Sequence, residues 1–532
     1  MDTSIPWSAE LRTLAARFGD ACAVVDGSGG RLTYRELDAN AHVFARGLVD
    51  AGVLPGEPIA ALLPNGIAGV CVSFGIRIAG AAEVPLSWGY TTEEIEWCAR
   101  IAGFRHVFTR PERAQALGPI GLAPRQANFS SILDDGASLP PAPAQAASRI
   151  LFTSGTTGRP KGVVYRHGPR WIGEQLLKAT LPFTPHPGGK LLLMTPFPHG
   201  ASLLTYAWTA FGGEVVILDG VDTDAVGHWL RRGDVDAVFA PPTVLAKLAG
   251  ALGNQRITGV RCIFTGTQAL AAGLYEKACA IFGPVVRITY GKTECTNPIT
   301  WLEPAEVHRW FTGGPGDPPP TGACVGWPAP GVEVEILPSE SDVTDAAAPD
   351  AAGADACGTP PDGEIWLRAA HMSSGVIGTA GFEAHGPCGW HRTGDLGHVD
   401  ARGRLVLTGR LADVIKTGGY RVNPDEIEQC LAGMEKASQV CITSVPSEYW
   451  GETIVAVAEQ AVEGWIDEAR SRVAALSRHK QPRLHLALTT LPRNPQGKVS
   501  RRQIRQFILQ TCEVIDGPYP RLEPRNAAPA SE

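Results

Sequence analysis

One ten-residue stretch, residues 153–162, has the composition of a phosphate-binding loop. It reads Thr-Ser-Gly-Thr-Thr-Gly-Arg-Pro-Lys-Gly. Glycines let the backbone approach a ligand closely, and hydroxyls, backbone N–H groups and an ammonium can all donate to an anion. This composition predicts a polyphosphate ligand. The residues expected to contact it are Thr153, Ser154, Gly155, Thr156, Thr157, Gly158 and Lys161.

The flanking residues predict a mobile loop between two strands. The run 149–152 favours a strand before the loop, and Val163-Val164-Tyr165 favours one after it. A Walker A loop would instead open a helix with Gly-Lys-Ser/Thr, whereas Pro160 and Gly162 flank the lysine here. A hairpin without a ligand is a poorer explanation, because such a turn needs one or two special residues rather than ten.

The same stretch resembles the phosphate loop of the acyl-adenylate-forming superfamily. That superfamily contains acyl-CoA and aryl-CoA synthetases, firefly luciferase and the adenylation domains of nonribosomal peptide synthetases. Further motifs follow in the superfamily's order, up to the end of the chain. The resemblance implies that the protein binds ATP and Mg²⁺ and activates a carboxylic acid.

Residues 290–294, Tyr-Gly-Lys-Thr-Glu, match the superfamily's Tyr-Gly-x-Thr-Glu motif. Tyr290 offers a flat face on which adenine can stack, and Gly291 lets the backbone come close. Thr293 can donate to the α-phosphate, and Glu294 is a hard oxygen ligand suited to Mg²⁺. We therefore expect Thr293 and Glu294 to be catalytic, with Glu294 as the metal ligand.

Two motifs in the C-terminal third resemble the superfamily's ribose contacts. The carboxylate of Asp395, in Thr-Gly-Asp, can accept both ribose hydroxyls. By resemblance, Arg410 also contacts the ribose, and an interdomain hinge lies two residues later. This chain has Ala412 there instead of the usual Asp or Lys. A hinge only has to absorb a change in φ and ψ, so alanine is compatible with a hinge but lacks the polar contact.

Residues 491–501 resemble the superfamily's Pro-x-x-x-x-Gly-Lys-x-x-Arg motif, which makes Lys498 the expected catalytic lysine. A lysine near the C-terminus is ordinarily a solvated charge, but the Pro, Asn and Gly before Lys498 indicate a presented loop. By resemblance, the C-terminal domain rotates after the first step and Lys498 leaves. Lys416, Gly418 and Gly419 then line a tunnel for the pantetheine thiol of coenzyme A.

The expected acyl pocket has walls in residues 199–206 and 265–270. His199 resembles the histidine that gates this pocket in the superfamily, although a hydrogen-bonded loop histidine explains it equally well without the resemblance. Thr267 and Gln268 depart from the superfamily's Gly-Gly-Ala-Pro-Leu turn and add hydrogen-bonding groups near the substrate or the adenine.

Composition indicates a chain of several domains without a membrane span. It has 532 residues, 44% hydrophobic and 19% charged, and a net charge of −7, which argues against nucleic-acid or anionic-membrane binding. Its 12 cysteines include no Cys-x-x-Cys pair and indicate reduced thiols in the cytoplasm. The N-terminus does not read as a signal peptide. The most apolar stretch, residues 66–86, is interrupted by Arg77 and Glu83, as in a buried helix and strand.

Alternating strand and helix patterns predict an α/β fold with mostly parallel sheets covered by helices. Thr33 and Glu36 form a capping box at the start of a helix. A further helix is expected at about 67–79, followed by a strand at 82–86.

The resemblance divides the chain into a large N-terminal adenylation domain with a β-rich subdomain, residues 1–409, and a small mobile α+β domain, residues 410–517. An insertion near 338–362, rich in Ala, Asp, Pro and Gly, and the tail 518–532 are expected to be disordered. We expect a monomer or a homodimer.

The resemblance implies a ligase that forms acyl-AMP and then passes the acyl group to coenzyme A. No aspartate lies between Leu191 and Leu218, where amino-acid-activating relatives carry one, so an α-amino acid substrate is disfavoured. The acceptor could instead be a carrier-protein thiol, an amine or an internal hydroxyl. Residues 163–167 resemble β-lactone-forming relatives, whereas residues 409–416 suit a thioester former better. A non-catalytic adenylate sensor is disfavoured because the expected catalytic and nucleotide-binding residues are all retained: Lys161, Glu294, Asp395, Arg410 and Lys498.

Overall fold

The computed structural model describes residues 4–127, 129, 137–153, 160–266, 268–313, 322–338, 362–493 and 498–525. Several predicted features lie outside these residues. They are the loop residues Ser154, Gly155, Thr156, Thr157 and Gly158, the turn residue Thr267, the expected insertion apart from its end positions 338 and 362, and the last part of the tail.

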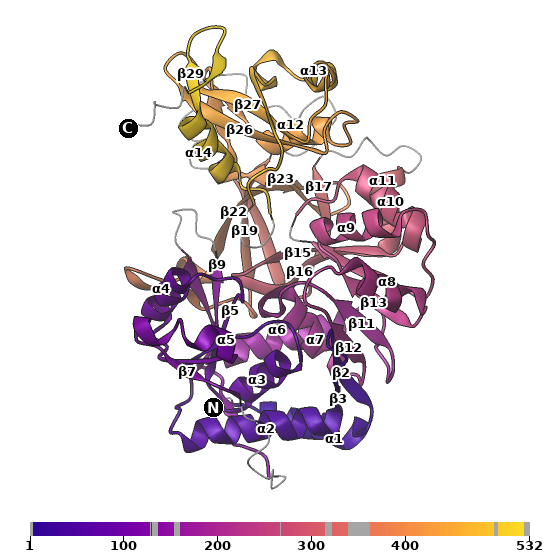
Figure 1. The fold of residues 1–532 in the computed structure, drawn as a ribbon, viewed down its shortest axis with the longest axis vertical. Coiled ribbons are helices and arrows are strands. Elements are labelled where there is room, and N and C mark those ends of the chain that lie inside the picture. Colours follow the sequence, from indigo (N-terminus) through magenta and orange to yellow (C-terminus); the bar gives the residue numbers. More distant parts are fainter. Residues whose placement is uncertain are drawn as a thin grey trace, which may run out of the picture.

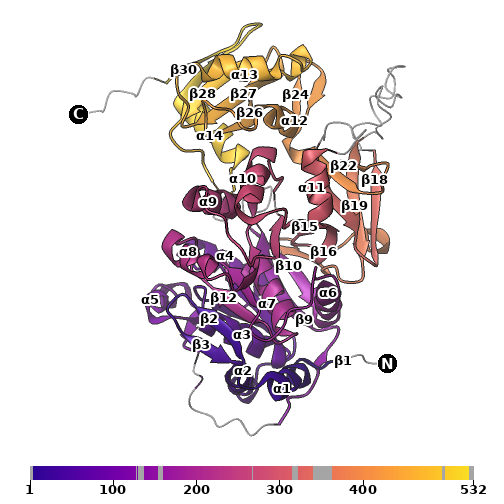
Figure 2. The ribbon, with the colours of Figure 1, turned by 90° about the vertical axis from the view of Figure 1, so that its right-hand side faces the viewer.

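The fold is α/β, as predicted. A large N-terminal part contains an eight-stranded and a thirteen-stranded sheet with helices packed against them. A smaller C-terminal part with its own five-stranded sheet sits at one end (Figure 1). Figure 2 shows the same two parts from the side.

The eight-stranded sheet contains the two strands that were predicted on either side of residues 153–162, the phosphate stretch. β9 and β10 form an antiparallel pair in which Thr153 faces Lys161, so the stretch joins the ends of adjacent strands. The prediction of strands on both sides is confirmed. In spatial order the sheet consists of β21 (Gly381–Ala384), β20 (Gly375–Gly378), β10 (Lys161–Arg166), β9 (Ala147–Thr153), β5 (Ala82–Leu86), β4 (Pro58–Leu62), β6 (His106–Thr109) and β7 (Ala123–Arg125).

The thirteen-stranded sheet has a parallel middle section, a long antiparallel section on one side of it, and one antiparallel edge strand, β3, on the other. The strands from β2 to β15 in the spatial order run parallel, and the neighbours from β15 to β18 are antiparallel. The order is β18 (Val332–Leu337), β19 (Gly363–Ala369), β22 (His391–Val399), β23 (Leu405–Arg410), β17 (Ala323–Pro328), β16 (Cys295–Leu302), β15 (Val286–Lys292), β14 (Cys262–Gly266), β13 (Val235–Phe239), β11 (Lys190–Leu193), β12 (Glu214–Ile217), β2 (Cys22–Asp26) and β3 (Arg31–Thr33).

Local signals explain where several helices begin and end. Thr33 and Glu36 form the predicted capping box of α2 (Tyr34–Asp50), and the helix expected from residue 67 is α3 (Ile67–Ile78). The other helices of the N-terminal part are α1 (Trp7–Phe18), α4 (Thr92–Ala102), α5 (Pro111–Ala114), α6 (His167–Ala179), α7 (Ser202–Thr209), α8 (Thr223–Arg231), α9 (Pro242–Leu252), α10 (Ala272–Phe282) and α11 (Pro304–Thr312).

The charged residues that interrupt the most apolar stretch are buried in ion pairs. Arg77 of α3 lies 3.0 Å from Glu174 of α6. Glu83 of β5 lies 3.3 Å from Arg149 and 3.4 Å from Arg170. Buried charges require such partners, which confirms the buried helix and strand. Within the described ranges, no helix has the length and apolarity needed to cross a membrane.

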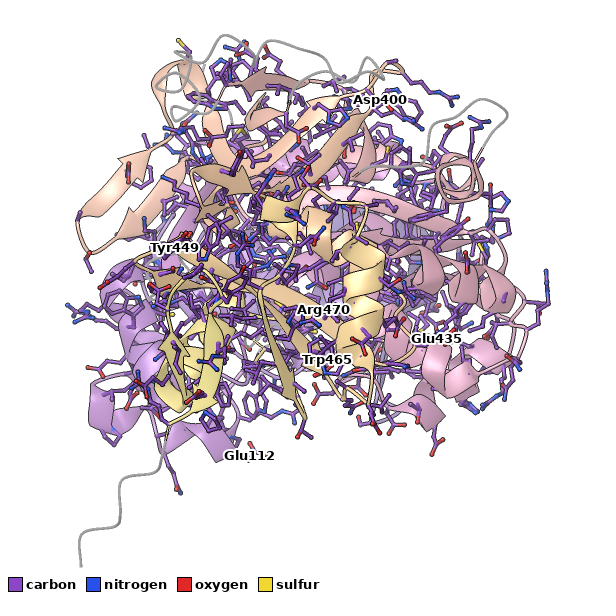
Figure 3. The ribbon with its side chains drawn as sticks, turned by 90° about the horizontal axis from the view of Figure 1, so that it is seen from above. Glu112, Asp400, Glu435, Tyr449, Trp465 and Arg470 are labelled. Atoms are coloured by element: carbon purple, nitrogen blue, oxygen red, sulfur yellow. The ribbon has the colours of Figure 1, made fainter. Side chains whose placement is uncertain are left out.

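The C-terminal part has a core of its own. Its two apolar clusters contain only residues from Ile415 onward. The strands of its five-stranded sheet are β25 (Tyr420–Val422), β24 (Ile415–Thr417), β27 (Gly451–Glu459), β26 (Gln439–Ser447) and β28 (Leu484–Leu488), and the helices are α12 (Pro424–Leu431), α13 (Trp465–Val473) and α14 (Arg501–Thr511). Figure 3 views the molecule from this end, with Trp465 and Arg470 labelled on α13.

The prediction of a disordered tail from residue 518 is wrong for its first part. Arg521–Pro524 form β30, which pairs antiparallel with β29 (Cys512–Ile515). Val514 and Leu522 pack onto an apolar cluster of the C-terminal part. A strand with one apolar residue among Arg, Glu and Pro has almost no periodic signal, because its stability depends on the partner strand.

Candidate active site

The predicted ribose ligand Asp395 is surrounded by hydrogen-bond donors. The Lys292 Nζ atom lies 3.1 Å from its Oδ2 atom, and the Arg410 Nε atom lies 3.2 Å from its Oδ1 atom. The Tyr290 hydroxyl also donates to Oδ2. Burial alone would raise the pKa of Asp395, but the positive charges of Lys292 and Arg410 outweigh it, and the pKa lies below its ordinary value. Asp395 is therefore an anion at neutral pH.

Three strands of one sheet bring these residues together. Tyr290 and Lys292 occupy alternate positions of β15 and so share a face. Asp395 and Arg410 face each other across β22 and β23. Lys292 also donates to the carbonyl oxygen of Thr393 at 2.7 Å, which ties the end of β15 to β22.

Lys498 belongs to the same cluster, although it lies far along the chain from the other members. Burial and repulsion by Arg410 and Lys292 lower the pKa of Lys498 to about 8, and the attraction of Asp395 only partly offsets them. The structure thus brings together residues from three separate predicted motifs: Tyr290, Asp395 with Arg410, and Lys498.

The Tyr-Gly-Lys-Thr-Glu motif forms the end of β15 and the turn into β16. Gly291 is needed for packing, because a Cβ atom there would lie 2.7 Å from the Asn297 Oδ1 atom. The carbonyl oxygen of Thr293 accepts a hydrogen bond from the Tyr165 hydroxyl at 2.8 Å. Since Tyr165 belongs to β10, this bond connects the motif to the strand that begins at Lys161.

Glu294 is the predicted ligand of Mg²⁺. Its backbone carbonyl oxygen accepts from the Ser373 amide at 2.9 Å, which fixes the turn. Among the residues that the structure describes, no group of three or more His, Cys, Asp or Glu could hold a metal by itself. Mg²⁺ in nucleotide sites is usually bound by one or two carboxylates together with phosphate oxygens, so a single glutamate beside a nucleotide fits this cation.

Residues 11–377 match the protein-family model described as AMP-binding enzyme. The match covers more than half of the chain. The chain belongs to the AMP-binding enzyme family.

Several relatives in this family are CoA ligases. The chain is 28% identical to the 2-succinylbenzoate–CoA ligase of Geobacillus kaustophilus (strain HTA426), over 93% of this chain and 96% of that protein. It is 29% identical to a 4-chlorobenzoate–CoA ligase of Arthrobacter sp, over 97% and 96%. It also matches 41% of the phosphinothricin tripeptide synthetase PhsB of Streptomyces viridochromogenes, at 27% identity over 93% of this chain.

The solved structures of similar fold include ATP-bound MatB from Rhodopseudomonas palustris. Its TM-score is 0.79 at 23% identity, over 94% of this chain and 98% of that one. The o-succinylbenzoate CoA synthetase MenE of Bacillus subtilis has a TM-score of 0.77 at 23% identity, over 94% and 98%. At this identity the similarity establishes the shared fold alone.

In this AMP-binding enzyme, hydrogen bonds hold the chain around the predicted gate residue, His199. The backbone of His199 lies in a π-helical turn, Phe197–Ala201. Arg149 of β9 donates to the Pro198 carbonyl oxygen at 2.9 Å and to the Ser202 Oγ atom at 3.0 Å. The strand that leads into the phosphate stretch therefore also holds the segment expected to gate the acyl pocket.

Other predicted contacts lie outside the Asp395 cluster. Gln268 is exposed after β14, and Lys416 is exposed on β24, where its amide donates to Glu452 at 2.9 Å. Gly418 and Gly419 have φ angles of 57° and 81°, which favour glycine. The Lys416 segment is therefore presented on the surface of the C-terminal part.

Three residues near the cluster were not predicted from the sequence: Lys292, His385 and His391. The His385 and His391 rings lie 4.9 Å apart. Burial lowers the pKa of His391 to about 4, although the negative charge of Glu294 acts to raise it. Burial lowers the pKa of His385 as well. Both rings are therefore neutral at pH 7. Alternation along β22 could have revealed His391, because positions 391 and 395 share one face.

Proposed function

We propose that this AMP-binding enzyme is an acyl-CoA synthetase. It would convert a carboxylic acid and ATP to acyl-AMP and pyrophosphate, and then transfer the acyl group to the thiol of coenzyme A, releasing AMP. The observation that supports this most strongly is the cluster of Asp395, Arg410 and Lys498, in which a half-buried ammonium lies near the carboxylate that is expected to bind the ribose.

In the first step, a carboxylate oxygen attacks the α-phosphorus of ATP and the bond to the pyrophosphate oxygen breaks. Both reactants are anions, so the site must hold them in line and neutralise their charge. Lys498 would act at the attacking oxygen and the α-phosphate, Thr293 would donate to the α-phosphate, and Lys161 would bind the leaving phosphates. A Mg²⁺ ion held by Glu294 would add positive charge at the phosphate oxygens.

In the second step, the thiol sulfur attacks the acyl carbon. The C–S bond forms, the C–O bond to AMP breaks, and the thiol proton is released to solvent. Lys498 has to leave the site before the thiol can enter, and rotation near Ala412 would bring the exposed segment of Lys416, Gly418 and Gly419 to the thiol path.

We expect Lys416→Ala to slow the second step while leaving the first unchanged. The reason is that Lys416 lies outside the Asp395 cluster, on the surface proposed to meet the thiol. Single-turnover thioester formation from supplied acyl-AMP should fall by roughly tenfold, the effect of losing one charged contact, at an unchanged rate of pyrophosphate exchange. An unchanged single-turnover rate would reject this role.

The pH dependence of the first step should reflect Lys498. Its ammonium form is fully present well below pH 8 and is lost as the pH rises through about 8. Because kcat/KM reports the free enzyme, kcat/KM for ATP in pyrophosphate exchange should fall above this pH. The kcat value should fall only at higher pH, because bound phosphates stabilise the ammonium. A kcat/KM value that stays level up to about pH 10 would contradict the role.

The relatives and the sequence suggest which carboxylic acids to test first as substrates. CoA ligase relatives are named for 2-succinylbenzoate and 4-chlorobenzoate, which makes aryl acids the first candidates. The segment Leu191–Leu218 contains no aspartate, which argues against an α-amino acid. The match to PhsB keeps a carrier-protein thiol as the alternative acceptor.

Pyrophosphate release with a panel of aryl, medium-chain and amino acids, each with and without CoA, tests the proposal. We expect one group of acids to release pyrophosphate, and CoA to convert the same acids to thioesters. Pyrophosphate release without thioester would favour another acceptor. Nucleotide binding without pyrophosphate release from any acid would contradict the proposal and favour a sensor.

A further inference from the structure

Lys292 is the variable residue of the Tyr-Gly-x-Thr-Glu motif, and its ammonium is held between two acceptors. The Nζ atom donates to the Thr393 carbonyl oxygen at 2.7 Å and to the Asp395 Oδ2 atom at 3.1 Å. The Lys292 side chain is 14% exposed and that of Asp395 is 7% exposed. The contact is therefore a largely buried ion pair with two charge-assisted hydrogen bonds, rather than a surface pair.

The two oxygens of Asp395 have different surroundings. Oδ2 accepts from Lys292 and from the Tyr290 hydroxyl, both on β15. Oδ1 faces Arg410, whose side chain is 60% exposed. A buried pair of donors holds one oxygen, whereas the donor at the other oxygen is open to solvent and can make way for a ligand. The Oδ1 edge is thus the side from which a sugar could be bound.

We propose that Lys292 is a positioning residue for ribose recognition, because it fixes the Asp395 carboxylate so that the Oδ1 edge meets the ribose hydroxyls of the nucleotide. The inference rests on the ribose role of Asp395 in the proposed function. It predicts that the preference for ATP over its deoxy analogues depends on Lys292, although Lys292 itself would not touch the sugar hydroxyls.

Direct binding of nucleotides tests this without knowledge of the acid. Calorimetric titration with ATP, 2′-deoxy-ATP and 3′-deoxy-ATP, each with Mg²⁺, gives the ratio of dissociation constants. The wild-type enzyme should bind each deoxy analogue ~10-fold or more weaker than ATP, as expected for the loss of a hydrogen bond to a charged group. In Lys292→Met this ratio should fall to within ~3-fold, because an unsupported carboxylate no longer holds the geometry.

Lys190→Met is the matched control. The Lys190 Nζ atom also contacts a carboxylate and a carbonyl oxygen, Asp234 at 3.0 Å and Gly188 at 3.3 Å, and its side chain is 13% exposed. It lies at the start of β11, and the variant should keep the wild-type ratio. If Lys292→Met does not fold, as judged from its melting curve, Lys292→Gln is used. It removes the charge but keeps a donor for Thr393, and the same loss of preference is expected.

The outcomes separate this inference from the proposed function. An unchanged ratio in Lys292→Met or Lys292→Gln overturns the inference, even if all three nucleotides bind more weakly, because a uniform loss indicates a structural or phosphate role. Asp395→Ala should abolish the preference. If Asp395→Ala loses the preference for ATP and Lys292→Met keeps it, the positioning role of Lys292 is rejected, whereas the ribose role of Asp395 is not. If the wild-type enzyme binds all three nucleotides equally, the ribose role of Asp395 is rejected as well.

Discussion

Lys498→Ala should lower the rate of acyl-AMP formation by ~10²–10³-fold, the cost of removing one preorganised donor from a developing charge. Lys498 is half-buried near Asp395 and Arg410, and the loss of solvent around its ammonium already lowers its pKa to about 8. An ammonium in such an environment acts more strongly on a phosphate than it would in water, because the local dielectric is low. Acid-dependent ATP–pyrophosphate exchange measures this step.

The same variant should retain the second half-reaction. Thioester formation from supplied acyl-AMP and CoA should stay within about threefold of the wild-type rate, since the proposed rotation removes Lys498 from the site before the second step. Lys436→Ala, which removes an exposed lysine of the C-terminal part, is the control and should leave both half-reactions unchanged. Equal losses in both half-reactions of Lys498→Ala would count against a role confined to adenylation.

Arg501→Met should destabilise the C-terminal part by about 2 kcal/mol, between the typical cost of losing an exposed ion pair and that of losing a buried one, because the side chains of this network are 20–32% exposed. The Arg501 guanidinium contacts Asp413 at 2.7 Å, Glu428 at 2.7 Å and also Asp425. Burial raises the pKa of Glu428, and Arg501 opposes this shift. Without the arginine, three neighbouring carboxylates would repel one another and Glu428 would lose its counter-ion.

Hydrogen exchange of the amides in β26 and β27 measures this effect, because it reports local opening in a chain of several domains. Arg505→Met is the matched control on the same helix. Arg505 lies 3.0 Å from Glu452, but its side chain is 40% exposed, so its removal should cost less than about 1 kcal/mol. Similar, small effects in both variants would show that the Arg501 network is not a stabilising feature.

Arg501 also connects the stability of this part to the proposed chemistry. Asp413 follows directly after Ala412, the expected hinge position, and Arg501 lies three residues after Lys498. The ion pair between Arg501 and Asp413 therefore joins the hinge segment to the start of α14, close to the proposed catalytic lysine. Arg501→Met should consequently weaken acyl-AMP formation in addition to local stability.

Elements with strong local signals were predictable from the sequence. The capping box of Thr33 and Glu36 sets the start of α2, and the apolar runs on both sides of the phosphate stretch are β9 and β10. Residues 163–165 are strand-forming in themselves, so no distant partner was needed to recognise them. The exception is β30, where the partner strand β29 rather than the residues of β30 determines the structure.

The sequence by itself determined the family and the types of residue at the site, because motifs such as Tyr290–Glu294 are contiguous and their chemistry depends on residue type. Only the tertiary structure decided which charges compensate each other. Lys292 forms an ion pair with Asp395, and the charges of both residues act on the Lys498 ammonium. These interactions join β15, β22 and the segment before α14, which are far apart in the chain. Electrostatic energy depends on distance and burial in space, so spacing along the chain could not reveal that Lys292 contacts Asp395.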